Sequence, residues 1–255
     1  MTQPADIGIS SSAYAELLLP AALARIAELG TAAEIRSFGL HTLLSARNRR
    51  AALAAGLPYT VHGPFGYAGI GDVDENARRE ALDEHRRHLA AAAGGGARLY
   101  VAHPDWHREG TPHDPAVVDA LERSFRELRE LQSETGVEVV IENMPGAGQS
   151  RFTHPGDLDL QGLGLILDVG HASISGCLEA WLADPRAPLR HVHLHDNHGT
   201  GDDDDPHLPL GAGVIDAAAV LAAARATGAS VVLEHDSEAA VLASIAHLRA
   251  RGLLD

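Results

Sequence analysis

The feature that most constrains this chain is a regular alternation of short apolar segments with helical patterns. Eight segments are typical of strands, at residues 6–10, 32–37, 57–62, 98–103, 137–142, 163–168, 190–195 and 229–234. Segments with apolar residues at helical spacing, or rich in alanine, lie between them. Strands that are apolar on both faces are typical of a buried parallel sheet. The alternation therefore predicts the α/β fold class.

Eight strands and eight helices within 255 residues fit a single closed (β/α)8 TIM barrel. The expected helices lie at residues 17–29, 42–55, 74–94, 115–135, 155–160, 177–182, 216–226 and 238–248. The alternative, a doubly wound open sheet, is disfavoured because no G-x-G-x-x-G motif opens a helix after the first strand. No segment resembles a linker, so we expect one domain over residues 1–255.

Polar residues that can bind metals stand at the ends of six of these strands. They are His62, His103, Glu142, Asp168, His193 and Glu234. In a parallel barrel these ends meet at one mouth. Carboxylates that end apolar strands are costly to bury unless a cation or a hydrogen-bond network meets them. Because imidazole and carboxylate suit zinc, manganese or iron, the pattern predicts a divalent metal site at that mouth.

Two loops offer further ligands to the same mouth. His171 lies three residues after Asp168, close enough in a turn for both to reach one centre. Asp205 and His207 lie two residues apart in the polar loop after the seventh strand. All three are therefore predicted metal ligands.

The seventh strand carries three histidines of the same parity. His191, His193 and His195 alternate with apolar residues, and side chains two residues apart point to the same face of a strand. Periodicity alone therefore does not decide which of the three is the ligand.

The predicted substrate-binding residues follow three strand ends. Phe65 and Trp106 could form an apolar wall over a substrate, although packing of aromatic residues at the rim would give the same pattern. Asn143 directly follows Glu142 and is the third predicted substrate contact.

Composition excludes several classes of partner and mechanism. The formal net charge of −15 disfavours a protein that holds nucleic acid by its phosphates. All 20 basic residues are arginine, which excludes a lysine Schiff base and a phosphate-loop lysine. Cys177 is the only cysteine, so intrachain disulfides and thiolate metal centres are excluded, and we expect a packed, neutral thiol.

The chain lacks the patterns of targeting and membrane segments. Its first residues have no basic start and no apolar core of signal-peptide length, and no apolar run of membrane-spanning length occurs. We expect a cytoplasmic protein without a membrane partner, acting on a small molecule.

The chain resembles the xylose isomerase-like TIM-barrel superfamily, which contains endonuclease IV, sugar isomerases and epimerases of ketoses or sugar phosphates. The motifs that carry the resemblance are VHGPF at 61–65, VAHPD at 101–105, IENMPG at 141–146, LDVGHA at 167–172, HVHLHDN at 191–197, DPHLPLGAG at 205–213 and VVLEHD at 231–236. They cover nearly the whole chain from the third strand onward.

The resemblance implies specific roles for these residues. Glu142, Asp168, His193 and Glu234 match the four core ligands of the isomerases and epimerases. Glu142 and Glu234 would act there as the acid and base, and His171 would lie beside the substrate.

The endonuclease branch uses further ligands to complete a three-zinc site. Five residues match them here, namely His62, His103, His171, Asp205 and His207. The resemblance thus implies one to three divalent ions, with zinc as the first candidate and manganese, iron or cobalt as alternatives.

We therefore expect an isomerase or epimerase of a small sugar, sugar phosphate or related hydroxy-carbonyl compound. The alternative is a multi-zinc phosphoesterase or other hydrolase, on a small substrate rather than DNA, and a third reading is a non-catalytic barrel that binds a metal or carbohydrate. The arginine that ketose 3-epimerases carry shortly after the strand-seven histidine is replaced here by Asp196, Asn197 and His198. The sequence does not determine the substrate, the native metal or the oligomeric state.

Overall fold

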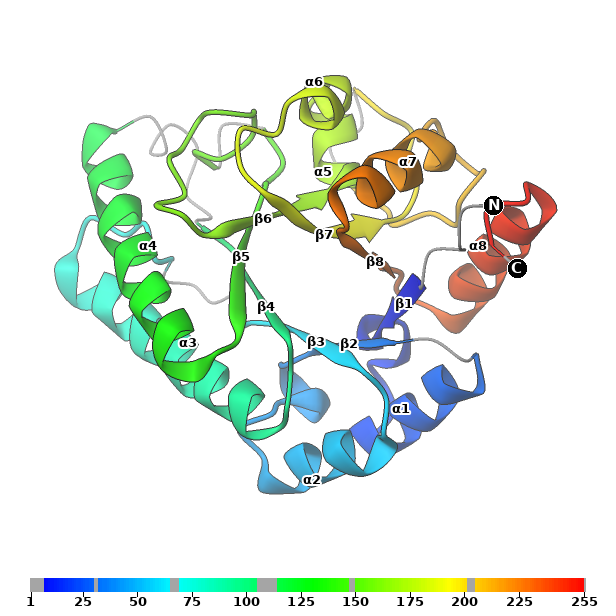
Figure 1. Cartoon of the computed structure of the whole chain (residues 1–255), viewed down its shortest axis with the longest axis horizontal. Helices are drawn as coiled ribbons and strands as arrows, with labels where there is room; N and C mark the ends of the chain where they lie inside the picture. The colour runs from blue at the N-terminus through cyan, green and yellow to red at the C-terminus, as the bar shows by residue number, and fades with distance from the viewer. Residues whose placement is uncertain are drawn as a thin grey trace.

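Eight parallel strands close into a barrel in chain order, with β8 pairing back to β1 (Figure 1). The computed structural model describes residues 7–29, 32–64, 69–104, 114–146, 150–200 and 205–254. The strands are β1 (Ile7–Ser10), β2 (Ala33–Arg36), β3 (Tyr59–His62), β4 (Leu99–Ala102), β5 (Glu138–Glu142), β6 (Gly164–Asp168), β7 (Leu189–Leu194) and β8 (Ser230–Leu233). The predicted (β/α)8 barrel is confirmed.

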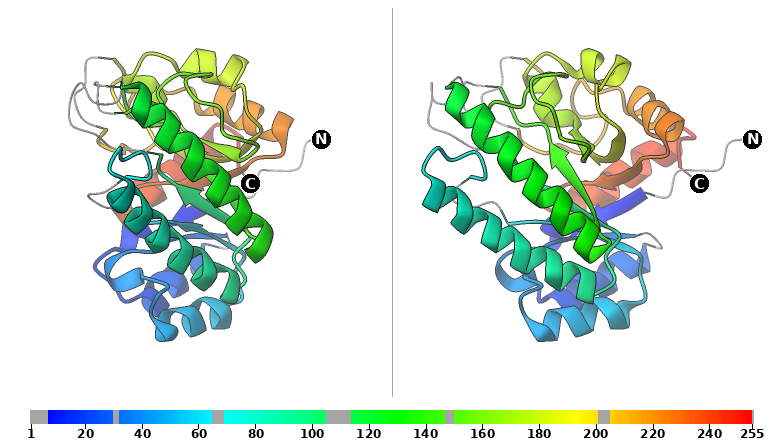
Figure 2. Two further views of the ribbon diagram at one scale, coloured as in Figure 1. Left: turned by 90° about the vertical axis from the view of Figure 1, so that its left-hand side faces the viewer. Right: turned by 60° about the vertical axis from the view of Figure 1, so that its left-hand side comes forward.

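Helices surround the barrel on its outside, and α3 and α4 lie side by side along one flank (Figure 2). They are α1 (Leu19–Glu28), α2 (Ala46–Ala55), α3 (Glu75–Gly94), α4 (Pro115–Thr135), α5 (Val169–Ile174), α6 (Leu178–Ala183), α7 (Ala217–Thr227) and α8 (Glu238–Ala250). Short 3-10 turns, η1 (Ser11–Tyr14) and η2 (Gly39–His41), follow β1 and β2. Within the described ranges, no helix has both the length and the apolar character needed to cross a membrane.

The connections on either side of β6 differ from the prediction. The helix expected at residues 155–160 is absent, and that segment forms turns. There the carboxylate of Asp157 accepts hydrogen bonds from the main-chain N–H groups of Thr153 and His154, which favours a turn. Instead α5 begins directly after β6, because Asp168 accepts a bond from the N–H of His171 as a helix N-cap. The helix α5 therefore replaces the absent helix in the predicted number, and α5 and α6 both lie between β6 and β7.

Two apolar cores hold the barrel together. The larger one packs the outward residues of the strands against the helices. It includes Cys177, whose Sγ donates to the carbonyl of Thr153 and whose burial raises the pKa of its thiol to about 11. The thiol is neutral, as expected. A smaller cluster of opposite strand parity fills the barrel interior at β4, β5 and β6 and consists of Leu99, Val101, Val140 and Ile166.

Polar side chains fill the interior of the barrel on its other side. The inward residues Glu34 of β2, Thr60 of β3 and His191 of β7 are buried, and Thr60 and His191 are both hydrogen-bonded to Glu34. The barrel interior is therefore apolar on one side and polar on the other, and the polar side lies beneath the strand end that carries His193.

Candidate metal centre

The polar strand-end residues lie together around His193 at the C-terminal mouth of the barrel. The Nδ1 atom of His193 is 2.8 Å from Oε2 of Glu234, 3.5 Å from Oε1 of Glu142 and 3.7 Å from Oδ2 of Asp168. Glu142, Asp168 and His193 are buried, and the side chain of Glu234 is 13% exposed. Four strands, β5 to β8, thus direct one imidazole and three carboxylates at a common point.

Glu142 lies between two groups of histidines. Its Oε2 atom is 3.0 Å from Nε2 of His103 and 3.4 Å from Nε2 of His62. Its Oε1 atom faces His193 and lies 3.7 Å from Nδ1 of His171. A carboxylate with one oxygen in each group can be shared by two neighbouring ions.

The carboxylates and imidazoles of the site favour one another's charged forms, although burial opposes these forms. Burial opposes ionisation of Glu142, but the positive charges of His103 and His193 hold its pKa well below the ordinary value. Burial likewise opposes ionisation of Glu234, and the neighbouring His193 holds its pKa at about 2. Burial opposes protonation of His193, yet Glu234, Glu34 and Glu142 raise its pKa well above 6.5. The carboxylates are therefore ionised, and a cation can replace the proton of His193 between them.

Buried atoms without hydrogen bonds fit a metal at this point. In the described part of the chain, Oε2 of Glu142, Oδ2 of Asp168 and Nδ1 of His193 are buried and have no partner in hydrogen-bond geometry. Each nevertheless lies close to another potential ligand, and the groups within mutual reach of one ion include Asp168, His193 and Glu234. One imidazole and three carboxylates suit zinc, manganese or iron.

His171 and Asn143 hold the ends of β5 and β6 in register. Nδ1 of His171 lies 2.9 Å from the carbonyl oxygen of Asn143 and donates to it, which directs Nε2 away from this bond. The amide of Asn143 is fully buried, donates to the carbonyl of Asp168 and accepts from its N–H. The Asn143 side chain therefore clamps the two strands, and its predicted contact with substrate stays a prediction.

A second group of possible ligands lies in the loop after β7. Nε2 of His195 is 3.0 Å from Oδ2 of Asp205, and the rings of His195 and His207 are 4.3 Å apart between centroids. His207 has a φ of +43°, which is uncommon for a residue other than glycine. Residues in such backbone conformations occur often at functional sites. The sequence predicts Asp205 and His207 as ligands, and His195 lies close enough to share an ion with them.

The carboxylate of Asp196 holds this loop in place. It accepts hydrogen bonds from the N–H groups of Gly211, Gly213 and Ile215, each at 2.9 Å. The main chain of Asp196 also pairs with Leu208 through an isolated antiparallel bridge. The loop that carries Asp205 and His207 is thus closed at its base.

Contacts distinguish two of the three histidines that sequence parity left open. Nε2 of His191 is 2.9 Å from Oε2 of Glu34, and its Nδ1 is 2.6 Å from Oγ of Ser230. Both ring nitrogens of His191 are therefore bonded below the mouth, and His193 is the residue that faces the carboxylates.

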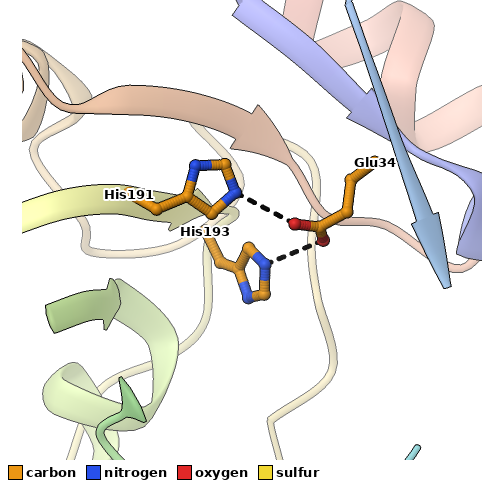
Figure 3. Close-up of side chains that lie close together, drawn as sticks. All are labelled: Glu34, His191 and His193. Atoms are coloured by element: carbon orange, nitrogen blue, oxygen red, sulfur yellow. Dashed lines mark hydrogen bonds and ion pairs between the residues drawn. The ribbon is translucent and has the colours of Figure 1, made fainter. Parts of the chain in front are cut away.

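Glu34 is a site residue that the sequence analysis missed. Its Oε1 lies 2.9 Å from Nε2 of His193, so one carboxylate joins His193 and His191 (Figure 3). Burial opposes its ionisation, but the charge of His193 and hydrogen bonds from both rings hold its pKa well below 4.5. The only indication in the sequence was one acidic residue between the apolar Ala33 and Ile35.

Two predicted substrate contacts, Phe65 and Trp106, lie outside the residues that the structure describes. Their predicted role as an apolar wall therefore stays a prediction.

Comparison with known sequences identifies relatives over most of the chain. Residues 23–251 match the sequence model of a family described as xylose isomerase-like TIM barrel. An uncharacterised protein of Methanocaldococcus jannaschii is 30% identical over 214 residues, which are 82% of this chain and 83% of that protein. A Mycobacterium leprae protein named probable endonuclease 4 is 29% identical over 197 residues, which are 72% of this chain and 75% of that protein.

Solved structures give the same picture of the fold. A D-tagatose 3-epimerase-like protein superposes with a TM-score of 0.83 at 25% identity, covering 96% of each chain. The 3-keto-D-glucoside 4-epimerase of E. coli superposes with a TM-score of 0.78 at 26% identity, covering 96% of this chain and 99% of that one.

Proposed function

The chain belongs to the xylose isomerase-like TIM barrel family, and from this premise we propose that it is a divalent-metal-dependent isomerase or epimerase. Its substrate would be a small sugar, sugar phosphate or related hydroxy-carbonyl compound. The observation that carries the proposal is the convergence of Glu142, Asp168 and Glu234 on Nδ1 of His193 at the barrel mouth. The sugar epimerases among the structural neighbours support it.

Four residues would hold the ion, namely Glu142, Asp168, His193 and Glu234. When bound, a divalent ion at this point polarises a substrate carbonyl and its neighbouring hydroxyl. Zinc is the first candidate for one imidazole with three carboxylates, and manganese, iron or cobalt suit the same donors.

The two glutamates supply the proton transfers. Both are held ionised, so either carboxylate can accept a proton from the carbon beside the carbonyl. Because they come from β5 and β8, on either side of β6 and β7 in the barrel, one can remove a proton and the other return one to the opposite face. Return to the opposite face inverts that carbon. Transfer of this proton to the carbonyl carbon, together with transfer of the neighbouring hydroxyl proton to the carbonyl oxygen, interconverts aldose and ketose. His171, beside Asp168, would hold a substrate hydroxyl.

The test combines isotope exchange with a matched pair of variants. Chelator-treated protein is reloaded with manganese, magnesium, cobalt or zinc and incubated with a panel of small sugars and sugar phosphates in deuterated water. We expect an isomer or epimer that carries solvent deuterium. Glu142→Gln should abolish the reaction, whereas Glu138→Gln, at the partly exposed start of the same strand, should not. Turnover without exchange and without an isomer would contradict the proposal.

A second candidate function has specific support in the extra ligands. His62 and His103 at Oε2 of Glu142, with His195, Asp205 and His207 in the loop, supply donors for more than one ion. A multi-zinc phosphoesterase or other hydrolase would use such a set, and the relatives named probable endonuclease 4 support this candidate. The net charge of −15 favours a small substrate over DNA.

Metal stoichiometry separates the two candidates. About three zinc ions per chain, lost in part when His62, His103 or His207 is replaced, would support the hydrolase. One ion that survives those replacements but is lost with Glu142→Gln or Asp168→Asn would support the isomerase or epimerase.

A further inference from the structure

The contacts of Glu34 assign it a role that the proposed chemistry does not include. We infer that Glu34 is a positioning residue of the metal centre: its carboxylate keeps a proton on Nε2 of His193 and thereby makes Nδ1 the nitrogen that binds a divalent cation. This inference rests on the proposed metal dependence, and it concerns the ring of His193 and not the substrate.

The first step is that every polar group facing the Glu34 carboxylate donates to it. Glu34 is fully buried on β2, with Oε1 2.9 Å from Nε2 of His193 and Oε2 2.9 Å from Nε2 of His191 (Figure 3). The hydroxyl of Thr60 donates to the same Oε2 at 3.2 Å. An ionised carboxylate has acceptor sites only, so both imidazoles must carry a proton on Nε2.

The second step is that His191 fixes the carboxylate without competing for the ion. With its Nε2 proton directed at Glu34, the other nitrogen of His191 is hydrogen-bonded to the hydroxyl oxygen of Ser230 at 2.6 Å. Neither nitrogen of His191 then remains for a cation. Together with Thr60 it holds Oε2 in place, and this keeps Oε1 directed at His193.

The third step concerns the opposite edge of the His193 ring. A neutral imidazole with a proton on Nε2 has its lone pair on Nδ1. Nδ1 is the atom that faces Glu234 at 2.8 Å, with Glu142 and Asp168 also within 4 Å. Without an acceptor at Nε2 the proton could move to Nδ1 and block the ligand position. Carboxylates that fix a metal-binding histidine in this way typically change metal affinity by about 10- to 100-fold.

Zinc affinity of an isosteric variant provides the first measurement. In Glu34→Gln the amide oxygen can accept from only one of the two rings, while the amide N–H2 group must face the other. We expect zinc affinity, measured by competition with a chromophoric chelator, to fall about 10- to 100-fold. The matched control is Glu138→Gln, the same replacement at the partly exposed start of β5, which should keep the wild-type affinity.

The nitrogen signals of His193 provide the second measurement, which a purely structural role would not change. In 15N-labelled protein loaded with zinc, the wild type should show the ion on Nδ1 and a slowly exchanging proton on Nε2. In Glu34→Gln the Nε2 proton should exchange rapidly or be lost. Zinc on Nε2 in the wild type, or unchanged affinity in a folded Glu34→Gln, would overturn the inference. Weakened affinity with unchanged nitrogen signals would also overturn it, because Glu34 would then act through packing alone.

Neither measurement uses a substrate, so a failure to find isomerase or epimerase activity leaves the inference intact. If Glu34→Gln does not fold, the wild-type spectrum decides alone. A wild-type protein that binds no divalent ion would refute the proposed function. It would overturn this inference as well, because there would be no ion for Nδ1 to bind.

Discussion

The two sides of the barrel interior are equally buried but differ in chemistry. On the side of β4, β5 and β6 the inward side chains are apolar, as Val101, Val140 and Ile166 illustrate. On the side of β2, β3 and β7 the inward side chains are Glu34, Thr60 and His191, linked by hydrogen bonds. The apolar side stabilises the barrel by packing, which does not depend on the residues at the mouth. The polar side is directional, because its bonds set the orientation of the His193 ring at the mouth.

The largest effect is expected for a substitution that removes the hydrogen bonds of the polar side. Glu34→Leu removes the acceptor shared by His191 and His193 and leaves two buried Nε2–H groups without it. Removing one partner from a buried charged pair costs about 3–5 kcal/mol, so we expect a loss of this size in the free energy of unfolding. Urea denaturation measures it. A loss below 1 kcal/mol would mean that the polar side contributes as little as an exposed ion pair.

Metal binding sharpens the comparison, because the polar side is hydrogen-bonded to the proposed ligand His193. At a zinc concentration of about 100 times Kd, the wild type should gain about 2.7 kcal/mol in the free energy of unfolding, and chelation should remove the gain. The gain should shrink in Glu34→Leu and persist in Ile166→Val. Equal gains in both variants would show that the two sides are equally remote from the ion.

The pH dependence should also differ between the two sides in the metal-free protein. The folded pKa of Glu34 lies below 4.5, so its contribution is present above pH 4.5 and is lost as the pH falls further. The folded pKa of His193 lies above 6.5, so its contribution is complete below pH 6.5 and is lost as the pH rises through the folded pKa. The destabilisation by Glu34→Leu should therefore be greatest between these values and decline on either side by up to about 1.4 kcal/mol per pH unit. The effect of Ile166→Val should be the same at every pH.

The smallest expected effect lies on the apolar side. Ile166→Val removes one methylene from the cluster of β4, β5 and β6 and should cost about 1 kcal/mol in the free energy of unfolding. Metal affinity should change little, because the side chain of Ile166 is aliphatic and offers no hydrogen bond to a proposed ligand. A change in zinc affinity as large as that of Glu34→Gln would contradict the division into two sides.

Local pattern was sufficient to predict the barrel and the residues at its mouth. Each strand is a short apolar run, and the topology of a parallel barrel brings all strand ends to one face, so residues such as Glu142 and Glu234 could be placed without tertiary information. The helix α5 was not predictable in this way. It depends on the carboxylate of Asp168 bonding the N–H of His171 rather than remaining free.

Glu34 could not be predicted, for a different reason. Its partners, His191 and His193, lie 157 and 159 residues away in sequence. A single glutamate in a strand of four residues has the pattern of an exposed side chain as much as of a buried one. The pairing of His195 with Asp205 likewise depends on the path of a loop, which follows from tertiary contacts and not from strand periodicity.

The closed base of the loop after β7 has a consequence for how the protein can diversify. Asp196 ties the loop to Gly211, Gly213 and Ile215, and a side chain at Gly213 would clash with the carbonyl of Asn197. Changes in length between these anchors can therefore leave the hydrogen bonds of Asp196 in place. Such a loop can acquire new preferences for small molecules through changes in its length and sequence, while the barrel remains intact.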